Sequence, residues 1–372
     1  MKLDVAERPA GAGLLGSQPD IDVSRLAHRI SGDVLAHPFD RGRYATDASI
    51  YQLMPQAVVR PRTRDDLAAT LAFAREEGVS VTARGGGTSQ SGQTVGEGLI
   101  VDCSRYLNKL ISVDVEARTC VVEPGIVLDE LNRLLAPHDL WYPIDVSTGS
   151  RATIGGMTGN NSCGTRSLRY GIMRDRVLGI EGLRADGSAF AFSSDTSEAQ
   201  GPLVGDLEAL GLREGGFIAS AFPEVSRRVG GYNIDALVPP SDGDGPVNLA
   251  TLLCGSEGTL ALSDRITLSL APRPKRKALG VCHFPTFRAA MDAAQHIVTL
   301  APVAVEVVDR TLIELARDIP MFAETMSKFV RGAPDALLLT EFAEDDGEEN
   351  LRRLSQLEAL MGDLGYPDGV FR

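Results

Sequence analysis

Apolar side chains recur with helical spacing shortly after the first fifty residues. Thr63 and Asp66 form an amino-terminal cap, and Gly78 stands where the helix is expected to end. Between them, the apolar face is formed by Leu67, Leu71 and Ala74. The β-branched run at residues 79–83 then predicts a short strand. The order is therefore helix, strand and, at the carboxyl end of the strand, a loop rich in glycine.

Alternating or continuous apolar runs predict further strands, joined by short turns. They lie at residues 98–102, 111–115, 119–122, 177–183 and 189–192. A helix with apolar positions at Val127, Leu128, Leu131, Leu134 and Leu135 interrupts the series. Since the strands pair through hairpins, such as the one with Asp186-Gly187 at its turn, the pattern predicts an α+β fold. Residues 1–50 form a polar lead with one predicted amphipathic helix at residues 23–35.

The loop at residues 84–93 contains four glycines and the hydroxyl groups of Thr88, Ser89 and Ser91. Glycine lets the main chain approach a ligand and adopt positive φ, so this composition predicts a backbone cradle for phosphate. The spacing matches neither the Gly-x-Gly-x-x-Gly turn nor a Gly-Lys-Ser/Thr phosphate loop. A mobile surface loop is the alternative interpretation.

A second segment, residues 141–171, is rich in small and polar side chains and lacks periodicity. About thirty residues of this kind are too many for an idle connection, so a role in binding a flat ring or a pyrophosphate is the simpler explanation. An Ω-type loop packed on itself is the alternative. A third small-residue turn, residues 252–260, carries one acid, Glu257, and is a weak signal alone.

Composition and charge limit the function classes. The 372 residues suffice for two or three domains, and a net charge of −13 argues against nucleic-acid binding. A local basic cluster at Arg166, Arg169, Arg174 and Arg176 is explained at least as well by solvated arginines or by partners of opposite charge. Neither a leader peptide nor an 18-residue apolar run is evident, so we predict a cytoplasmic protein.

Cysteines and histidines are scattered. Cys103, Cys120, Cys163, Cys254 and Cys282 form no Cys-x-x-Cys pair, and the five histidines form no His-x-x-x-His pair. We therefore expect reduced thiols and no metal site or iron–sulfur cluster within these residues.

Taken together and in this order, the segments resemble the FAD domain of the vanillyl-alcohol-oxidase/para-cresol-methylhydroxylase (PCMH) type. Within it they resemble the D-lactate, glycolate and D-2-hydroxyglutarate dehydrogenase branch. The resemblance runs from about Tyr44 to Ala271. Its motifs are Arg60-Pro61, residues 84–93, Glu123-Pro124-Gly125, Thr153-Ile154-Gly155-Gly156, Asn161-Ser162-Cys163-Gly164, Arg169-Tyr170-Gly171 and Gly255-Ser256-Glu257-Gly258-Thr259.

The resemblance implies an α+β architecture in three parts. After the lead at residues 1–50 comes a two-subdomain PCMH-type FAD-binding domain at 51–274, then the start of a ferredoxin-like substrate-capping domain at 275–372. The FAD-binding residues that it implies are Pro61, Arg84, Gly85, Gly86, Gly87, Thr88, Ser89, Gly92, Gln93, Pro143, Asp145, Thr148, Thr153, Gly155, Gly156, Asn161, Ser162, Gly164, Tyr170, Gly171 and Glu257.

Thr88 occupies the position where relatives with covalently attached FAD have the histidine of Arg-x-Gly-Gly-His-Ser. Threonine cannot form a histidyl link, so we expect non-covalent FAD. The implied reaction is oxidation of a D-2-hydroxy acid to the 2-keto acid, with hydride transfer to flavin N5. The implied electron acceptor is a quinone, a cytochrome, an electron-transfer flavoprotein or an iron–sulfur domain, with direct reduction of dioxygen as an alternative. A homodimer is compatible with the sequence.

The catalytic residues stay unassigned, because the branch's His-x-Gly-Asp-Gly-Asn-x-His motif is not found here. Residues 242–245 are superficially similar but lack both histidines, and we interpret them as a loop. We therefore expect an amino-terminal portion of a longer flavoenzyme. His283 and Glu306 are the cap-region groups worth considering for catalysis, although a place on an alternating strand and at a domain seam explains them better. Two alternatives are a non-catalytic FAD-binding electron-transfer subunit and an NADPH-dependent UDP-sugar enoyl reductase.

Overall fold

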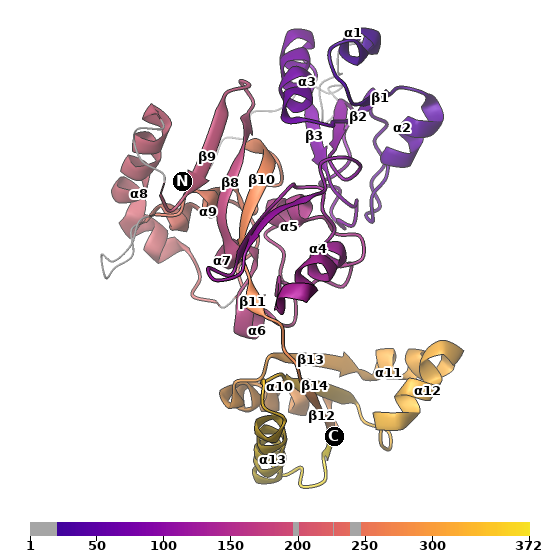
Figure 1. Cartoon of the computed structure of the whole chain (residues 1–372). Helices are drawn as coiled ribbons and strands as arrows, with labels where there is room; N and C mark the ends of the chain where they lie inside the picture. The colour runs from indigo at the N-terminus through magenta and orange to yellow at the C-terminus, as the bar shows by residue number, and fades with distance from the viewer. Residues whose placement is uncertain (1–20, 196–200, 226, 239–246) are drawn as a thin grey trace, which may run out of the picture.

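The computed structural model describes residues 21–195, 201–225, 227–238 and 247–372 (Figure 1). Three large sheets and a two-stranded pairing of β7 (Leu140–Trp141) with β11 (Ala271–Pro272) organise these residues. The predicted loop at residues 242–245 lies outside the described ranges.

The first sheet has the strand order β1-β2-β4-β3, with β1 (Asp33–Leu35), β2 (Ala57–Arg60), β4 (Leu99–Asp102) and β3 (Val81–Arg84). β4 runs parallel to β2 and β3, while β1 is antiparallel to β2. Helix α3 (Arg64–Glu77) connects β2 to β3 and buries one face, including Leu67 and Leu71. The predicted cap and stop are confirmed, since Thr63 accepts a bond from the Asp66 amide and Gly78 has φ +67°.

The prediction of an amino-terminal helix at residues 23–35 is confirmed only for residues 23–27 and is wrong for the rest of that range. Helix α1 spans Val23–Ala27, β1 follows, and α2 spans Pro38–Tyr44. Gly32 explains the break, because a Cβ there would lie 2.3 Å from the carbonyl oxygen of Arg60. The chain at this point is therefore pressed against β2 and enters the sheet.

The second sheet is antiparallel in the order β5-β6-β10-β8-β9. Its strands are β5 (Leu110–Asp114), β6 (Thr119–Val122), β10 (Ala261–Ser269), β8 (Val177–Arg184) and β9 (Ala189–Ser193). The helices of this subdomain are α4 (Leu128–Leu135), α5 (Ile154–Asn160), α6 (Ser167–Tyr170), α7 (Met173–Arg176), α8 (Pro202–Ala221) and α9 (Ala250–Leu253), with short 3₁₀ turns at Ala136–His138 and Ile234–Leu237. The hairpin predicted at Gly187 and the apolar face of α4 are confirmed.

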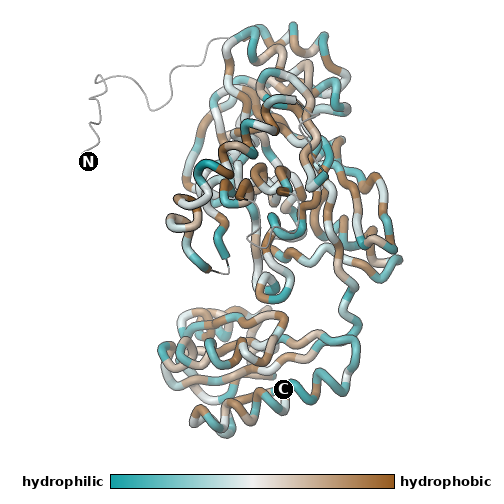
Figure 2. Tube along the Cα trace, turned by 90° about the vertical axis from the view of Figure 1, so that its left-hand side faces the viewer, coloured by the Kyte–Doolittle hydropathy of each residue, from teal (hydrophilic) through white to brown (hydrophobic). Residues whose placement is uncertain are grey.

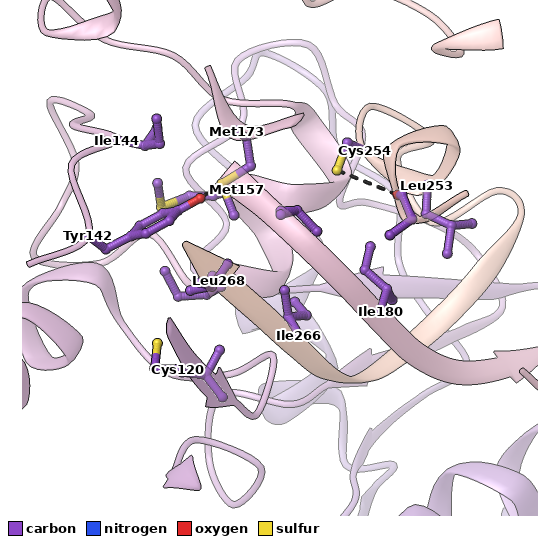
Figure 3. Close-up of a cluster of buried hydrophobic side chains, with 14 of the residues drawn as sticks. Cys120, Tyr142, Ile144, Met157, Met173, Ile180, Leu253, Cys254, Ile266 and Leu268 are labelled. Carbon is purple, nitrogen blue, oxygen red and sulfur yellow. Dashed lines mark hydrogen bonds between the residues drawn. The ribbon is translucent and has the colours of Figure 1, made fainter. Parts of the chain in front are cut away.

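Figure 3 shows the core of this subdomain, where Tyr142, Met157 and Met173 pack beside β6, β8 and β10. The Tyr142 hydroxyl donates to the Met173 sulfur at 2.9 Å. All five cysteines are free thiols, and burial raises the pKa of Cys120 and Cys254 to about 12. These thiols are packing residues, because a protonated, enclosed sulfur is a poor nucleophile.

The carboxyl-terminal unit has its own sheet, which lies below the first two sheets in Figure 1, and the segment after β11 connects the two parts of the chain (Figures 1 and 2). Its antiparallel sheet has the order β13-β14-β12-β15, made of β12 (Ala278–Phe284), β13 (Ala304–Asp309), β14 (Ala336–Phe342) and β15 (Val370–Phe371). Helices α10 (Phe287–Ile297) and α13 (Gly347–Asp363) cover one face. Helices α11 (Arg310–Asp318) and α12 (Pro320–Phe329) pack on the other.

Counted along the chain, this strand order is 4-1-3-2 with a helix in each crossover, which is the ferredoxin-like arrangement. The mixed sheets and helices confirm the predicted α+β class. Among the described residues, no helix is both long and apolar enough to cross a membrane.

Candidate cofactor site

A cavity of about 890 Å³ opens between the first two sheets, within the range of small-molecule and cofactor sites. Its walls come mainly from three stretches, within residues 83–94, 145–166 and 253–263. These are the three segments that sequence analysis singled out for their small residues. The fold thus brings into one site three stretches that the chain spreads over about half of its length.

The glycine loop that follows β3 is packed tightly against the second stretch. A Cβ on Gly85 would lie 2.1 Å from Thr153 Oγ1, and one on Gly86 would lie 2.3 Å from the Arg151 carbonyl oxygen. Both gaps are far below any van der Waals contact, so only glycine fits at these two positions. Gly87 has φ +65°, which an L-residue adopts with strain. The loop is a fixed element of the cavity wall, and its close backbone approach suits a pyrophosphate cradle.

Arg84 holds the ends of this loop in place. Its guanidinium donates to the carbonyl oxygens of Tyr44 at 3.1 Å, Thr46 at 2.8 Å and Thr94 at 3.4 Å, and it lies over the Tyr44 ring. Burial lowers the pKa of Arg84. Because these bonds occupy its terminal nitrogens, Arg84 shapes the loop.

Glu257 links the three stretches through one carboxylate. Its Oε1 accepts from Asn160 Nδ2 at 3.0 Å and from Gln93 Nε2 at 3.3 Å. The Ser89 hydroxyl donates to the Gln93 side-chain oxygen, and Ser162 Oγ donates to Asn160 Oδ1 at 3.1 Å. Glu257 has φ +52°, an uncommon conformation for a non-glycine residue that is favoured at functional positions. The resulting chain of hydrogen bonds runs along the cavity from the glycine loop to the third turn.

Asp145 organises the far end of the second stretch. It accepts from Thr165 Oγ1 at 3.0 Å and from the Arg166 amide at 3.2 Å. A Cβ on Gly164 would lie 2.0 Å from the Asp145 carbonyl oxygen, so this glycine permits a close crossing of two backbone segments. Asn161 is fully buried with φ +53°, and its side chain bonds the Arg174 amide and the Arg228 carbonyl. Its side chain therefore supports the wall.

Most of the residues predicted to bind the cofactor line this cavity, namely Arg84, Gly85, Gly86, Gly87, Thr88, Ser89, Gln93, Asp145, Thr148, Thr153, Gly155, Gly156, Asn161, Ser162, Gly164 and Glu257. The others, Pro61, Gly92, Pro143, Tyr170 and Gly171, do not line it.

Those outside the cavity have structural roles nearby. Gly92 turns the loop with φ +78° beside the Tyr51 ring, and Gly171 has φ +77° beside Asp175. Tyr170 packs edge-on against Trp141 with ring centroids 5.6 Å apart. Pro61 and Pro143 are buried.

The cavity also contains residues that sequence analysis did not assign to it. Arg227 and Val229 reach it from the segment before the Ile234–Leu237 turn, and Glu306 reaches it from β13. Within the described ranges, Glu306 is the cap residue that lines the cavity, as suits an acid at the seam between domains. His283 does not line it, and both ring nitrogens of His283 contact backbone groups of β12, α12 and their neighbours.

Two arginines on and beside α6 connect the cavity domain to the cap. Arg166 pairs with Asp145 at 3.4 Å and with Glu341 of β14 at 3.0 Å. Arg169 pairs with Glu344 at 2.5 Å and donates to the Ala301 carbonyl at 3.1 Å. The interpretation of this basic cluster as charge partners is therefore confirmed for both residues.

Two family models match the chain. The FAD binding domain matches residues 55–193, and the C-terminal domain of FAD linked oxidases matches residues 273–371. The chain belongs to the FAD-linked oxidase family, and two of the three stretches that line the cavity lie within the match to the FAD-binding domain.

Several curated relatives align with most of the chain. A D-2-hydroxyglutarate dehydrogenase from Pantoea ananatis is 33% identical over 91% of this chain and 34% of its own length. The glycolate oxidase subunit GlcD of Bacillus subtilis is 28% identical, over 91% of this chain and 63% of its own. A D-lactate dehydrogenase from Archaeoglobus fulgidus is 27% identical, over 80% of this chain and 56% of its own. The chain thus spans about a third of the length of the D-2-hydroxyglutarate dehydrogenases it matches.

Solved structures share the fold. An alkyldihydroxyacetonephosphate synthase superimposes with a TM-score of 0.68 at 15% identity, covering 96% of this chain and 62% of that protein. The BBE-like 1 protein of Physcomitrella patens superimposes with a TM-score of 0.61 at 13% identity, covering 91% of this chain and 60% of that protein.

Proposed function

We propose that this chain is the FAD-binding part of an oxidoreductase that converts a D-2-hydroxy acid, D-lactate or D-2-hydroxyglutarate, to the 2-keto acid. The observation that carries the proposal is the cavity, whose glycine cradle leaves no room for a Cβ at Gly85 or Gly86. The names of the D-2-hydroxyglutarate and D-lactate dehydrogenase relatives support the substrate class. When bound, FAD would supply the hydride acceptor of this reaction, and a separate acceptor would take up the electrons.

The chain's own groups would divide the work as follows. Main-chain N–H groups of residues 85–89 would bind the pyrophosphate, as exposed amides of a glycine loop do. The residues around Thr153 and Gly156 would close the wall beside the cofactor and exclude water, and Glu306 would place a carboxylate at the cap side of the cavity. The acceptor class, a homodimer and a cytoplasmic location remain part of this proposal. The catalytic base stays unassigned.

The test of this function is anaerobic. The chain is loaded with FAD, and the visible flavin absorption is followed on addition of D-lactate, D-2-hydroxyglutarate, glycolate or NADPH separately. We expect bleaching with a D-2-hydroxy acid and none with the L-enantiomer, which serves as the matched control. Bleaching by NADPH alone would support the enoyl-reductase alternative instead.

A second function is a non-catalytic FAD-binding subunit or fragment that passes electrons within a larger enzyme. It is supported by the cavity lining, which includes no histidine among the described residues, and by the 34% coverage of the dehydrogenase relatives. In that case no hydroxy acid bleaches the flavin, while dithionite reduces it and an added acceptor reoxidises it. Bleaching by D-lactate without a partner chain would contradict this second candidate.

We further propose that the FAD is dissociable, because Thr88 lines the cavity where covalent relatives have histidine. Precipitation of the loaded protein with acid is expected to leave all of the flavin absorbance in the supernatant, since a threonine hydroxyl forms no histidyl bond. A protein pellet that keeps its yellow colour after washing would contradict the prediction.

A further inference from the structure

Among the residues that the structure describes, three arginines line the cavity, Arg84, Arg166 and Arg227. The first two are engaged by the protein. Arg84 donates to three carbonyl oxygens, and Arg166 pairs with Asp145 and Glu341. Within the described part of the chain, Arg227 forms no hydrogen bond, ion pair or ring contact, and its side chain is exposed.

The residue that follows Arg227 is anchored by several contacts, although the Arg227 side chain is unpartnered. The neighbouring Arg228 bonds Asp235 and lies 4.1 Å from the centroid of the Phe222 ring. The Arg228 carbonyl accepts from Asn161 Nδ2 at 3.4 Å, which ties this segment to the cavity wall. Burial alone would raise the pKa of Asp235, but bonds and charges from Arg174 and then Arg228 outweigh it and hold the pKa below its usual range. Asp235 therefore stays ionised and anchors the segment at neutral pH.

The third stretch of the cavity wall supports the same placement. A Cβ on Gly255 would lie 3.0 Å from the Gly231 carbonyl oxygen and 3.5 Å from that of Val229, so the two segments are in contact. Arg227 thus lines the cavity between neighbours that contact Asn161 and Gly255, in a protein of net charge −13. An unpaired guanidinium in such a place is suited to an anionic ligand, which it can bind through two parallel N–H groups.

We propose that Arg227 is an anion-binding residue of this cavity, which contacts either a phosphate of the cofactor or the carboxylate of the substrate. Both ligands offer paired, negatively charged oxygens, the geometry that a guanidinium matches and an ammonium does not. The inference rests on the proposed function in that the cavity holds FAD. It assigns a specificity residue that the glycine motifs do not contain.

The test compares Arg227→Gln with Arg213→Gln, which removes the same charge from an exposed position of α8 outside the cavity. FAD is titrated into each apoprotein by flavin fluorescence, and oxalate is titrated into each FAD-loaded protein by the shift of its visible absorption. Loss of a charged hydrogen bond weakens binding by about tenfold or more. If Arg227 binds phosphate, the FAD Kd rises by that factor. If it binds carboxylate, the FAD Kd stays within about twofold and the oxalate Kd rises instead.

Arg227→Lys keeps the charge but loses the planar fork, so it is expected to recover part of the affinity that Arg227→Gln loses. If Arg227→Gln and Arg213→Gln have the same affinity for FAD and the same affinity for oxalate, the inference about Arg227 is overturned, while the proposed function is not affected. A wild-type chain that binds no FAD would overturn the proposed function with it. Neither titration needs turnover. Even if no hydroxy acid bleaches the flavin, the FAD titration therefore still tests whether Arg227 binds a phosphate of the cofactor.

Discussion

Replacing Gly86 with alanine is expected to weaken FAD binding by roughly 100-fold, because the new methyl group has nowhere to go. Its Cβ would lie 2.3 Å from the Arg151 carbonyl oxygen and 3.0 Å from the carbonyl carbon. A backbone carbonyl cannot rotate aside as a side chain can, so the loop itself must move away from the second stretch of the cavity wall. Titration of the apoprotein with FAD, followed by flavin fluorescence, measures the effect.

The matched control is Gly216→Ala on the exposed face of α8, where no atom lies within 4 Å of the added Cβ. Alanine in a helix is expected to stabilise the protein by about 0.5–1 kcal/mol and to leave FAD affinity unchanged. Far-ultraviolet circular dichroism of Gly86→Ala without FAD separates a local cradle defect from unfolding. Wild-type FAD affinity in a folded Gly86→Ala protein would show that the loop does not contact the cofactor.

The second large effect is expected at the contact between the cavity domain and the cap. Arg166→Met removes the cation between Asp145 and Glu341, whose side chains are 22% and 18% exposed. We expect a loss of about 1–2 kcal/mol in the free energy of unfolding, between the values for exposed and buried pairs. Cleavage by trypsin in the linker at residues 273–277, which contains two arginines and two lysines, is expected to become several-fold faster. Denaturation curves and the rate of proteolysis check the two expectations.

The corresponding control is Arg213→Met, because the Arg213–Glu214 pair is largely exposed, at 66% and 44%. Such pairs contribute about 0–1 kcal/mol, so stability and the rate of linker cleavage are expected to stay close to wild type. Equal behaviour of the two variants would mean that the cap is held by other contacts. Those contacts include the bonds of Arg169 to Glu344 and to the Ala301 carbonyl.

Local sequence signals predicted the elements whose stabilising interactions are local. The helix between Thr63 and Gly78 and the hairpin at Gly187 are determined by caps, turns and periodicity within a few residues. Strand β1 was missed because its partner β2 lies more than twenty residues later and a β-strand of three residues has almost no pattern of its own. A short polar stretch before such a strand resembles a continued helix until the partner is known.

The candidate site shows the same limit at the level of single residues. A glycine that faces a ligand and a glycine that merely turns the chain have the same letter, so Gly86 and Gly92 were equally plausible from sequence. Arg227 and Glu306 were not assigned to the cavity, because their place there depends on packing between distant segments. In the sequence, the charge of Arg227 was the one property that could have indicated a place in the cavity, and many exposed arginines share it. The three-dimensional contacts alone distinguish it from its neighbour Arg228.

The bonds that Glu257 makes to Gln93 and Asn160 have a consequence for biosynthesis. They join side chains separated by 164 and 97 positions along the chain. Contacts of such long range form late, since the intervening chain must be ordered before they close. During translation the cofactor cavity cannot be completed until the turn around Gly258 has left the ribosome. We therefore expect the nascent chain to capture flavin only after residues 93, 160 and 257 have all been synthesised.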